Sequence, residues 1–376
     1  MIVGYECLLT GPSESGVGIA ARELLQRLTV VRDDVKVVVF ASPKSDCGLP
    51  REERVDYRIS RFAGVCRATR VVWQQAVPPR FGRGHIDLYH ATGYILSSLK
   101  FRVPTVLSIY DTTALEHPHL TRWANACHFK FAVPPGARAA SMIIVPSRYV
   151  ANRLEAFLDI GPDRVCVIPL GVAAEFKVRS GAECPSELQV PYLLFVGNLE
   201  RKKNLLLLVR VLAELRKRGW NVRLVLAGSA GNAAGSIAAM AKAEGVQEAI
   251  VFTGYVNRAA LVTLYQGAAM LLYPSLDEGF GLPPLEAMAC GAPVVASNAG
   301  AIPEVTAGAA ILLEPADVRG WLEAIEAVMT NPSHRGKLCE MGLKRASEFS
   351  WQRTARHVIG VYEKTIAREA KRLWAQ

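Results

Sequence analysis

Two glutamates bracket a turn that is rich in glycine and proline, in the run Glu278-Gly-Phe-Gly-Leu-Pro-Pro-Leu-Glu286. The run follows an apolar stretch, residues 269–273, that is typical of a buried parallel strand, and Glu286 falls within a helical pattern. In open α/β sheets, the turn between a strand and its helix lies at the carboxyl edge, where ligands bind. One acid can face the reacting end of a ligand while the other accepts hydrogen bonds from hydroxyl groups. The spacing predicts a sugar and its nucleotide lying across one cleft.

A basic loop follows another apolar strand, residues 192–196, in the run Gly197-Asn-Leu-Glu-Arg-Lys-Lys-Asn204. Gly197 lets the backbone approach a ligand closely. Arg201, Lys202 and Lys203 precede a helix, whose positive end favours anions over cations. Three cationic side chains at the positive end of a helix make sense if a diphosphate binds between the lysines and the helix amides. The alternative interpretation is a solvated loop with scattered charge.

A glycine-rich turn, Gly11-Pro-Ser-Glu-Ser-Gly16-Val-Gly18, stands between the first strand and the first helix. It is not a full Gly-x-Gly-x-x-Gly motif, because Ala21 occupies the last position. Binding of NAD also requires an acid at the end of the second strand, and none occurs before Asp46. We therefore expect Gly16 and Gly18 to close over a phosphate held by the opposite domain.

Several polar residues follow strands in the first half of the chain. Tyr110 and Asp111 end an apolar strand, where a site role and a helix cap are about equally expected. His90 also ends a strand and is either a site residue or a structural histidine, and His117 is either a site residue or exposed. No Asp-x-Asp pair or metal-ligand spacing occurs. We expect Lys203 and its neighbours, not Mg²⁺, to neutralise phosphate, with no metal and no cofactor.

The composition indicates a globular protein with two α/β domains. The chain has 376 residues, of which 51% are hydrophobic and 21% charged. Short apolar segments alternate with amphipathic helices, which predicts parallel sheets wound on both faces. No apolar run reaches the roughly 18 residues that span a bilayer, and the N-terminus lacks the features of a signal peptide. The eight cysteines form no Cys-x-x-Cys pair, which favours reduced thiols in a cytoplasmic protein over disulfides or metal.

The predicted domain boundaries follow the periodicity. We expect an N-terminal domain over residues 1–172, a linker over 173–191, a C-terminal domain over 192–350, and a helix over 351–376 that returns to the first domain. The predicted strands are residues 2–8, 35–41, 86–90, 105–110, 142–145 and 165–168, then 192–196, 223–227, 250–253, 269–273, 293–296 and 310–313. Ser147 is the expected cap of a helix over 148–157, and Gly219 should end a helix over 205–218.

The positive charge is concentrated in the first half. Residues 1–180 hold 23 Lys and Arg against 16 Asp and Glu, and the whole chain has a net charge of +10. Residues 51–102 are rich in arginine, interleaved with Phe62, Val71, Val72, Trp73 and Phe81. This pattern fits either a basic face that rests on anionic lipid or an ordinary solvated surface. Nucleic acid is the weakest alternative, because no recognisable motif accompanies the charge.

Taken together, the acid-bearing turn, the basic loop and the motifs around them resemble those of a retaining glycosyltransferase of the GT-B fold, in the large family 4. The resemblance covers nearly the whole chain. Its most specific part is the run from Glu278 to Glu286 with Gly291-Ala-Pro-Val-Val-Ala-Ser297 and Ile302-Pro-Glu304. Supporting matches are Gly197-Asn-Leu-Glu200, Lys202-Lys-Asn-Leu205, Val145-Pro-Ser147, Val167-Ile-Pro-Leu-Gly-Val172, Phe252-Thr-Gly254-Tyr-Val256 and Phe349-Ser-Trp351. It implies two doubly wound Rossmann-like domains that face each other across a cleft.

The resemblance also implies a role for each candidate. Glu286 would hold the nucleotide ribose, and Lys203 and Lys202 would hold the diphosphate. Glu278 and the amides of Phe280, Gly281 and Leu282 would face the donor sugar. Tyr255 and Val256 would line the base pocket, and Gly16 and Gly18 would meet the phosphates from the other domain. We take Glu278, Lys203 and Asp111 as catalytic candidates, and Asn198, His90, Tyr110 and His117 as further substrate-binding candidates.

The chain departs from the family pattern in the loop after Gly197 and at the residue before Asp111. Asn198 follows Gly197 where a basic residue is usual, and Arg201 stands where proline is common. Tyr110 replaces the histidine that often precedes the acid at position 111, and His117 is a candidate for the missing imidazole.

The implied reaction moves a hexosyl group from a nucleotide sugar to an acceptor hydroxyl by a front-face mechanism that retains the anomeric configuration. The runs that begin at Ile86 and Tyr110 resemble bacterial mannosyltransferases of polysaccharide assembly, so GDP-mannose is the leading donor, with UDP-hexoses as the alternative. A lipid-linked glycan at the inner membrane face is the expected acceptor. A sugar-nucleotide epimerase, a non-catalytic nucleotide-sugar binder and a nicotinamide dehydrogenase are the rival classes.

Overall fold

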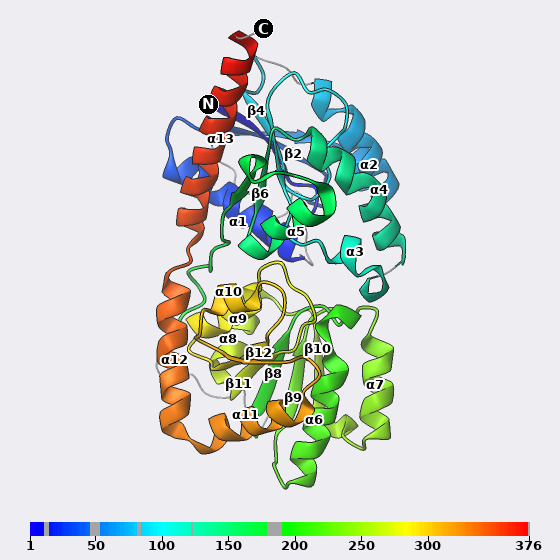
Figure 1. The fold of residues 1–376 in the computed structure, drawn as a ribbon, viewed down its shortest axis with the longest axis vertical. Helices are drawn as coiled ribbons and strands as arrows, with labels where there is room; N and C mark the ends of the chain where they lie inside the picture. The colour runs from blue at the N-terminus through cyan, green and yellow to red at the C-terminus, as the bar shows by residue number, and fades with distance from the viewer. Residues whose placement is uncertain (11–14, 46–52, 81–83, 122, 179–189, 375–376) are drawn as a thin grey trace. The chain divides into compact units, whose positions relative to one another are not determined.

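The computed structural model describes residues 1–10, 15–45, 53–80, 84–121, 123–178 and 190–374. The chain divides into two compact units (Figure 1). Unit 1 comprises Met1–Leu115, Ala124–Gly171 and Ser350–Gln376, and unit 2 comprises Glu116–Trp123 and Val172–Phe349. The segment Glu116–Trp123 therefore groups with unit 2, although we expected all of residues 1–172 in one domain. Residues 179–189 of the expected linker lie outside the described residues.

Unit 1 is built on a seven-stranded parallel sheet in the order β3-β2-β1-β4-β5-β6-β7. The strands are β1 Ile2–Glu6, β2 Lys36–Ala41, β3 Val55–Ile59, β4 Leu88–Ala91, β5 Thr105–Ser108, β6 Met142–Val145 and β7 Val165–Val167. The order reverses between β1 and β4, which is the doubly wound arrangement that the alternating pattern predicts.

The strand β3 was not predicted from the sequence. Its residues, Val-Asp-Tyr-Arg-Ile, carry two charges that pair with each other, since Arg58 Nη2 lies 2.9 Å from Asp56 Oδ2. Because β3 is an edge strand with exposed positions, it needs no continuous apolar run. The arginine-rich residues 51–102 therefore contain an edge strand and a helix, and Trp73 of that helix is only 6% exposed.

The helices of unit 1 are α1 Gly16–Val31, α2 Arg67–Ala76, α4 Trp123–Ala139, α5 Arg148–Leu158 and α13 Trp351–Trp374, and the short α3 spans Thr113–Glu116. Single 3₁₀ turns of this unit occupy η1 Phe62–Gly64, η2 Pro78–Arg80 and η4 Pro162–Arg164, while η3 Pro118–Leu120 lies in the segment that groups with unit 2. As predicted, the Ser147 hydroxyl caps α5 by accepting a hydrogen bond from the Val150 N–H, at 3.2 Å.

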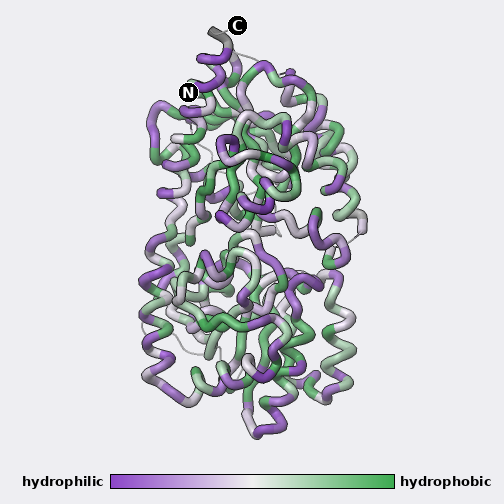
Figure 2. The backbone as a smooth tube through the Cα atoms, viewed as in Figure 1, coloured by the Kyte–Doolittle hydropathy of each residue, from purple (hydrophilic) through white to green (hydrophobic). Residues whose placement is uncertain are grey.

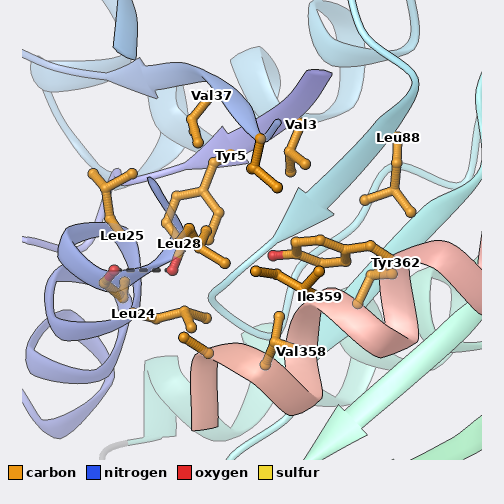
Figure 3. Packing of buried hydrophobic residues seen from close by; sticks show 14 of the residues in the cluster. Val3, Tyr5, Leu24, Leu25, Leu28, Val37, Leu88, Val358, Ile359 and Tyr362 are labelled. Carbon is orange, nitrogen blue, oxygen red and sulfur yellow. Dashed lines mark hydrogen bonds between the residues drawn. The ribbon is translucent and has the colours of Figure 1, made fainter. Parts of the chain in front are cut away.

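The C-terminal helix α13 packs in the core of unit 1, against α1. Val358, Ile359 and Tyr362 of α13 meet the leucines of α1, and the Tyr5 hydroxyl donates to the Ala21 carbonyl at 2.9 Å (Figure 3). Because these side chains are nearly fully buried, the last helix of the chain contributes to the same core as its first strand.

Unit 2 is built on a six-stranded parallel sheet in the order β10-β9-β8-β11-β12-β13. The strands are β8 Tyr192–Val196, β9 Arg223–Ala227, β10 Ile250–Gly254, β11 Met270–Tyr273, β12 Val294–Ser297 and β13 Ile311–Leu313. Each of the six strands expected in this half is present. Figure 2 shows mostly hydrophobic strands in this sheet, with hydrophilic and hydrophobic residues alternating along the surrounding helices.

The helices of unit 2 are α6 Leu205–Lys217, α7 Ala234–Ala243, α8 Arg258–Gly267, α9 Leu282–Ala289, α10 Ile302–Thr306, α11 Val318–Thr330 and α12 Pro332–Ser347, with 3₁₀ turns η5 Arg201–Lys203 and η6 Gln247–Ala249. Gly219 follows α6 in the left-handed region, with φ of 87°, as predicted for a residue that ends a helix. Within the described part of the chain, no helix is both long enough and apolar enough to span a membrane.

Candidate functional site

The basic loop and the acid-bearing loop lie side by side at the carboxyl edge of the unit 2 sheet. Lys203 ends η5, which follows β8, and Glu278 follows β11, the neighbour of β8. The Leu276 N–H donates to the Lys202 carbonyl at 2.8 Å, which joins the two loops through their backbones. Parallel strands thus bring these two candidate loops together at one edge of the sheet.

The side chains of Lys203, Glu278 and Tyr273 form a compact cluster. The Lys203 ammonium forms an ion pair with Glu278 Oε1 and donates to the Tyr273 hydroxyl at 3.0 Å. The Tyr273 hydroxyl in turn donates to the same Glu278 oxygen at 2.9 Å. Lys203 is 9% exposed and Glu278 8%, so most of their surface is removed from water. Buried charges need such partners, because an uncompensated one is costly.

The electrostatics of the cluster keep Glu278 ionised. Burial alone would raise the pKa of Glu278, but the positive charges of Lys203 and Lys202 outweigh it and bring the pKa to about 2. Burial and the adjacent Glu278 charge raise the pKa of Tyr273 well above its ordinary value, so this phenol stays protonated. At neutral pH the cluster holds one buried cation, one buried anion and a neutral hydroxyl between them.

Two glycines allow the backbone around Glu278 to pack closely. Gly300 has φ of 59°, and a Cβ placed there would lie 2.5 Å from both the N and O atoms of Glu278. The Ala301 N–H donates to the Glu278 carbonyl at 2.8 Å. Gly281 precedes α9 with φ of 102°, and a Cβ there would lie 2.6 Å from Ile302 Cδ1. The connection that carries Glu278 therefore depends on residues without a side chain.

Glu286 lies on α9, which begins at the same edge of the sheet. It is 8% exposed, and its Oε2 accepts a hydrogen bond from the hydroxyl of Tyr265 on α8 at 2.9 Å. Burial and the Glu286 charge raise the pKa of Tyr265, so the phenol remains a donor. The ring of Phe176 packs edge-on against Tyr265, with centroids 5.9 Å apart. Each of the two acids is thus held by a buried tyrosine.

The sequence did not single out Tyr273 or Tyr265 as site residues. Tyr273 is the last residue of β11, immediately before the acid-bearing connection, and its position at a strand end was the available signal. Tyr265 stands on a helix 21 residues before Glu286, and nothing in the local pattern indicates that contact.

The remaining unit 2 candidates lie in the connections that follow β8, β10 and β11, or at the start of α9. Asn198 is exposed at the start of the loop after β8, and Tyr255 is 51% exposed after β10, with Val256 half-buried. Phe280 is only 6% exposed because its ring packs against Phe349, with centroids 5.9 Å apart. Gly281 and Leu282 form the start of α9. The roles assigned to these residues remain predictions.

Apart from His117, the candidates from the first half of the chain lie in unit 1, and each has different neighbours. Gly18 is in α1, and a Cβ there would lie 2.5 Å from the Leu9 carbonyl oxygen, which explains this glycine by packing. Gly16 has no atom within 4 Å of such a Cβ. The turn residues 11–14 lie outside the described residues. Asp111 accepts a hydrogen bond from the Tyr94 hydroxyl at 3.3 Å, and the ring of Tyr110 packs edge-on against Tyr94.

His90 is not a surface residue of unit 1, which corrects its proposed contact with substrate. It is fully buried, and its Nδ1 and Nε2 lie 2.7 Å from the Tyr362 hydroxyl and 2.8 Å from the Ser108 hydroxyl. Burial lowers the pKa of His90 to about 3, so the imidazole is neutral. With both ring nitrogens occupied, His90 connects β4 to β5 and α13.

His117 is half-buried in the segment that groups with unit 2, beside His119.

Among the described residues, no group of three His, Cys, Asp or Glu side chains is arranged to hold a metal ion. Six cysteines in this part of the chain are free thiols, two of them, Cys7 and Cys290, buried. Metal independence remains a prediction from the sequence.

Two family models match this chain. Residues 15–176 match the model described as Glycosyltransferase Family 4, and residues 183–345 match the model described as Glycosyl transferases group 1. A curated relative, the O-antigen chain mannosyltransferase B of Escherichia coli, is 28% identical over 371 residues, which cover 93% of this chain and 96% of the relative.

Solved structures share the fold of the whole chain. The sucrose-phosphate synthase of Thermosynechococcus elongatus matches with a TM-score of 0.77 at 20% identity, covering 98% of this chain and 100% of that one. An Anabaena protein, HepE, in complex with UDP and glucose matches with a TM-score of 0.75 at 18% identity, covering 97% and 100%. The two family models together account for both units, and the chain belongs to the family 4 glycosyltransferases and has the GT-B fold.

Proposed function

We propose that this glycosyltransferase moves a hexosyl group, with mannosyl as the leading candidate, from a nucleoside diphosphate sugar to a hydroxyl group of a glycan or lipid-linked acceptor. The anomeric configuration is retained. The observation that carries the proposal is the buried Lys203–Glu278 ion pair at the carboxyl edge of unit 2, with Glu286 on the helix that follows.

Lys203 is suited to the diphosphate of the donor. As the glycosidic bond breaks, negative charge grows on the leaving diphosphate, and a nearby cation in a dry site stabilises it more than one in water does. Lys203 is held by Glu278 and Tyr273, so its ammonium is already in place. Lys202, whose charge reaches Glu278, adds a second cation to the same loop.

Glu286 is suited to the ribose of the nucleotide. A carboxylate accepts hydrogen bonds from two adjacent hydroxyl groups, and the donated hydrogen bond from Tyr265 fixes its orientation. Burial strengthens such bonds, because they form in a medium of lower dielectric constant than water.

Glu278 is not the base that deprotonates the acceptor. A pKa of about 2 makes it a weak proton acceptor at neutral pH, and general bases work best with pKa values near the working pH. We assign Glu278 to hydrogen bonding with the sugar and to holding Lys203. The acceptor oxygen bonds to the anomeric carbon on the face from which the diphosphate leaves as the bond to the diphosphate breaks, and a diphosphate oxygen takes the acceptor proton. Attack and departure on one face account for retention. Asp111 of unit 1, hydrogen-bonded to Tyr94, is the further catalytic candidate.

GDP-mannose is the proposed donor, and a UDP-hexose is the alternative. The mannosyltransferase name of a relative that aligns over 96% of its length favours mannose. The UDP and glucose in the Anabaena structure favour the alternative, although that protein is only 18% identical. We place the enzyme in the cytoplasm at the inner membrane face, where lipid-linked acceptors are found.

Donor turnover without acceptor tests the proposal. Wild-type protein is incubated with GDP-mannose and with UDP-glucose, and release of GDP or UDP is measured by chromatography. Slow release of GDP is expected from wild type and not from Lys203→Ala. Lys217→Ala removes a lysine that is paired with Glu214 on the surface, and it should match wild type. Equal release by Lys203→Ala would reject the assignment of Lys203.

The same experiment separates the rival classes. An epimerase would convert the nucleotide sugar into an isomer without acceptor, and a binding protein would leave it intact. Once an acceptor is found, the anomeric proton coupling of the product in NMR spectra distinguishes retention from inversion.

A further inference from the structure

Ser275 is a fully buried serine in the connection that carries Glu278, two residues after Tyr273 at the end of β11. Its exposed fraction is 0%. The hydroxyl of Ser297, the last residue of β12, donates to the Ser275 carbonyl and ties this backbone to the neighbouring strand. The Ser275 backbone is therefore fixed between two strands of the sheet, and only its hydroxyl can change direction.

The hydroxyl of Ser275 is shielded from solvent and makes no hydrogen bond to any residue that the structure describes. A buried hydroxyl without a partner destabilises the folded state, and native proteins keep few such groups. The stability of the free protein therefore does not explain why a serine stands at this position.

The polar groups beside this hydroxyl are Glu278 and Tyr273. Burial raises the pKa of Glu278, and the charges of Lys203 and Lys202 lower it, with a further lowering from the Ser275 hydroxyl. Burial and the Glu278 charge raise the pKa of Tyr273, and the Ser275 hydroxyl opposes them. The hydroxyl thus lies close enough to both groups to reach either one by turning about its Cα–Cβ bond.

The Glu278 carboxylate can accept another hydrogen bond. The Lys203 ammonium and the Tyr273 hydroxyl both bond to Oε1, so the lone pairs of Oε2 remain for a further donor. Hydrogen bonds to an ionised acceptor are stronger than those between neutral groups. In the free protein, however, the ion pair with Lys203 already compensates the charge of Glu278.

We propose that Ser275 is a positioning residue that holds Glu278 when the donor diphosphate draws the Lys203 ammonium toward itself. The proposal rests on the proposed function, in which Lys203 binds the diphosphate. As the ammonium turns to phosphate oxygens, its bond to Glu278 weakens, and a buried carboxylate that loses its cation is destabilised. The Ser275 hydroxyl then donates to the carboxylate and keeps it directed at the sugar.

This arrangement favours the donor complex over the free protein. The Ser275 hydroxyl lacks a partner before the donor binds and gains one afterwards, so its hydrogen bond contributes to donor affinity and not to folding. A serine that only supported the fold would do the opposite. We therefore expect the melting temperature of Ser275→Ala without nucleotide to equal or exceed that of wild type.

A double-mutant cycle tests the proposal. GDP and UDP are titrated by calorimetry into wild type, Ser275→Ala, Lys203→Gln and the double variant, and the nucleotide that wild type binds more tightly is used for the comparison. We expect Ser275→Ala to bind about tenfold more weakly than wild type, because the lost hydrogen bond is to a charged group. Added to Lys203→Gln, it should cause no further loss, since Glu278 then has no cation to lose.

Two further variants complete the comparison. Ser275→Cys occupies nearly the same space with a weak donor, so it should also lose nucleotide affinity while keeping the melting temperature of wild type. Ser147→Ala is the matched control, because Ser147 is equally buried but its hydroxyl caps α5. It should lower the melting temperature and leave nucleotide affinity unchanged.

The outcomes separate this proposal from the proposed function. Wild-type affinity in Ser275→Ala, a lower melting temperature of that variant without nucleotide, or an equal loss of affinity with and without Lys203 would each overturn the role of Ser275 alone. Wild-type affinity in Lys203→Gln, or binding of neither nucleotide by wild type, would overturn the proposed function and this role together.

Discussion

The Lys203 ammonium and the Glu278 carboxylate form a buried ion pair that joins the loops after β8 and β11. Replacing either partner alone would leave the other charge without compensation in a dry place, which is strongly destabilising. A diphosphate that binds Lys203 brings negative charge to a cation that is already neutralised. The donor must therefore share Lys203 with Glu278, and the second cation, Lys202, becomes important for affinity.

Tyr273→Phe should weaken catalysis while leaving the fold intact. The Tyr273 hydroxyl joins Lys203 and Glu278, and one such hydrogen bond contributes about 0.5–1.5 kcal/mol. We expect the rate of donor turnover to fall by about 2–12-fold, with most of the change in kcat. Steady-state kinetics on the purified variant measure this. No change in kcat or KM would show that the phenol does not position Lys203.

Gly300→Ala should damage the site through the backbone of Glu278. The new methyl group would lie 2.5 Å from two backbone atoms of Glu278, and alanine is also strained at a φ of 59°. Gly308→Ala is the matched control, because φ is 86° there and no atom lies within 4 Å of the added carbon. Both variants should lose stability in urea titrations, but only Gly300→Ala should lose most of its donor turnover. Equal activity of the two variants would contradict this role for Gly300.

Glu6 should make the stability of the protein fall as pH rises toward neutrality. It is buried in unit 1, and burial raises its pKa from 4.5 to about 7, against the opposing hydrogen bonds from Tyr89 and Gln74. Between these two values the folded state holds a proton that the unfolded state has released, so stability is lost as pH rises from 4.5 to 7. The full effect is about 3 kcal/mol.

Urea unfolding of wild type and Glu6→Gln at pH 5 and pH 8 measures this effect. The variant loses a hydrogen-bond acceptor at both values of pH, but it carries no buried charge at pH 8. Its stability relative to wild type should therefore improve by about 2–3 kcal/mol between pH 5 and pH 8. An unchanged difference would mean that Glu6 does not titrate in this range.

His90→Gln should lower stability without lowering the rate of donor turnover. His90 joins Tyr362 and Ser108 in the core, and leaving buried groups without partners costs about 1–3 kcal/mol. Because the pKa of His90 is lowered to about 3, wild type loses stability as pH falls below 6.5, and the variant should lose less. Melting temperatures and kinetics on one preparation test both parts. A lost rate with unchanged stability would restore His90 to the site.

The sequence predicted the elements whose residues follow a strict pattern. All the strands of unit 2 and the caps Ser147 and Gly219 were predicted, because buried parallel strands and helix ends leave strong local signals. The strand β3 was missed because an edge strand tolerates charged residues such as Asp56 and Arg58. Local pattern carries no information about a partner that the fold brings from another element.

In the candidate site, too, local patterns predicted some residues, while contacts between elements could not be predicted. Lys203 and Glu278 were predicted because each follows a strand of one parallel sheet, and such strands end at a common edge. Tyr265 could not be predicted, since its contact with Glu286 depends on how α8 packs on α9. His90 follows the same strand-end pattern as the site residues, but the packing of α13 over it makes it a core residue.

Nucleotide binding by the full-length protein is the strongest test of the roles proposed for Lys203 and Glu286. Thermal-shift or calorimetric titrations with GDP and with UDP, in the absence of metal, are compared for wild type, Glu286→Gln and Lys203→Gln. We predict that wild type binds one of the two nucleotides, with GDP favoured, and that each variant binds at least tenfold more weakly, while Lys217→Ala binds normally. Binding by both variants with wild-type affinity would contradict the claim that Lys203 and Glu286 hold one nucleoside diphosphate.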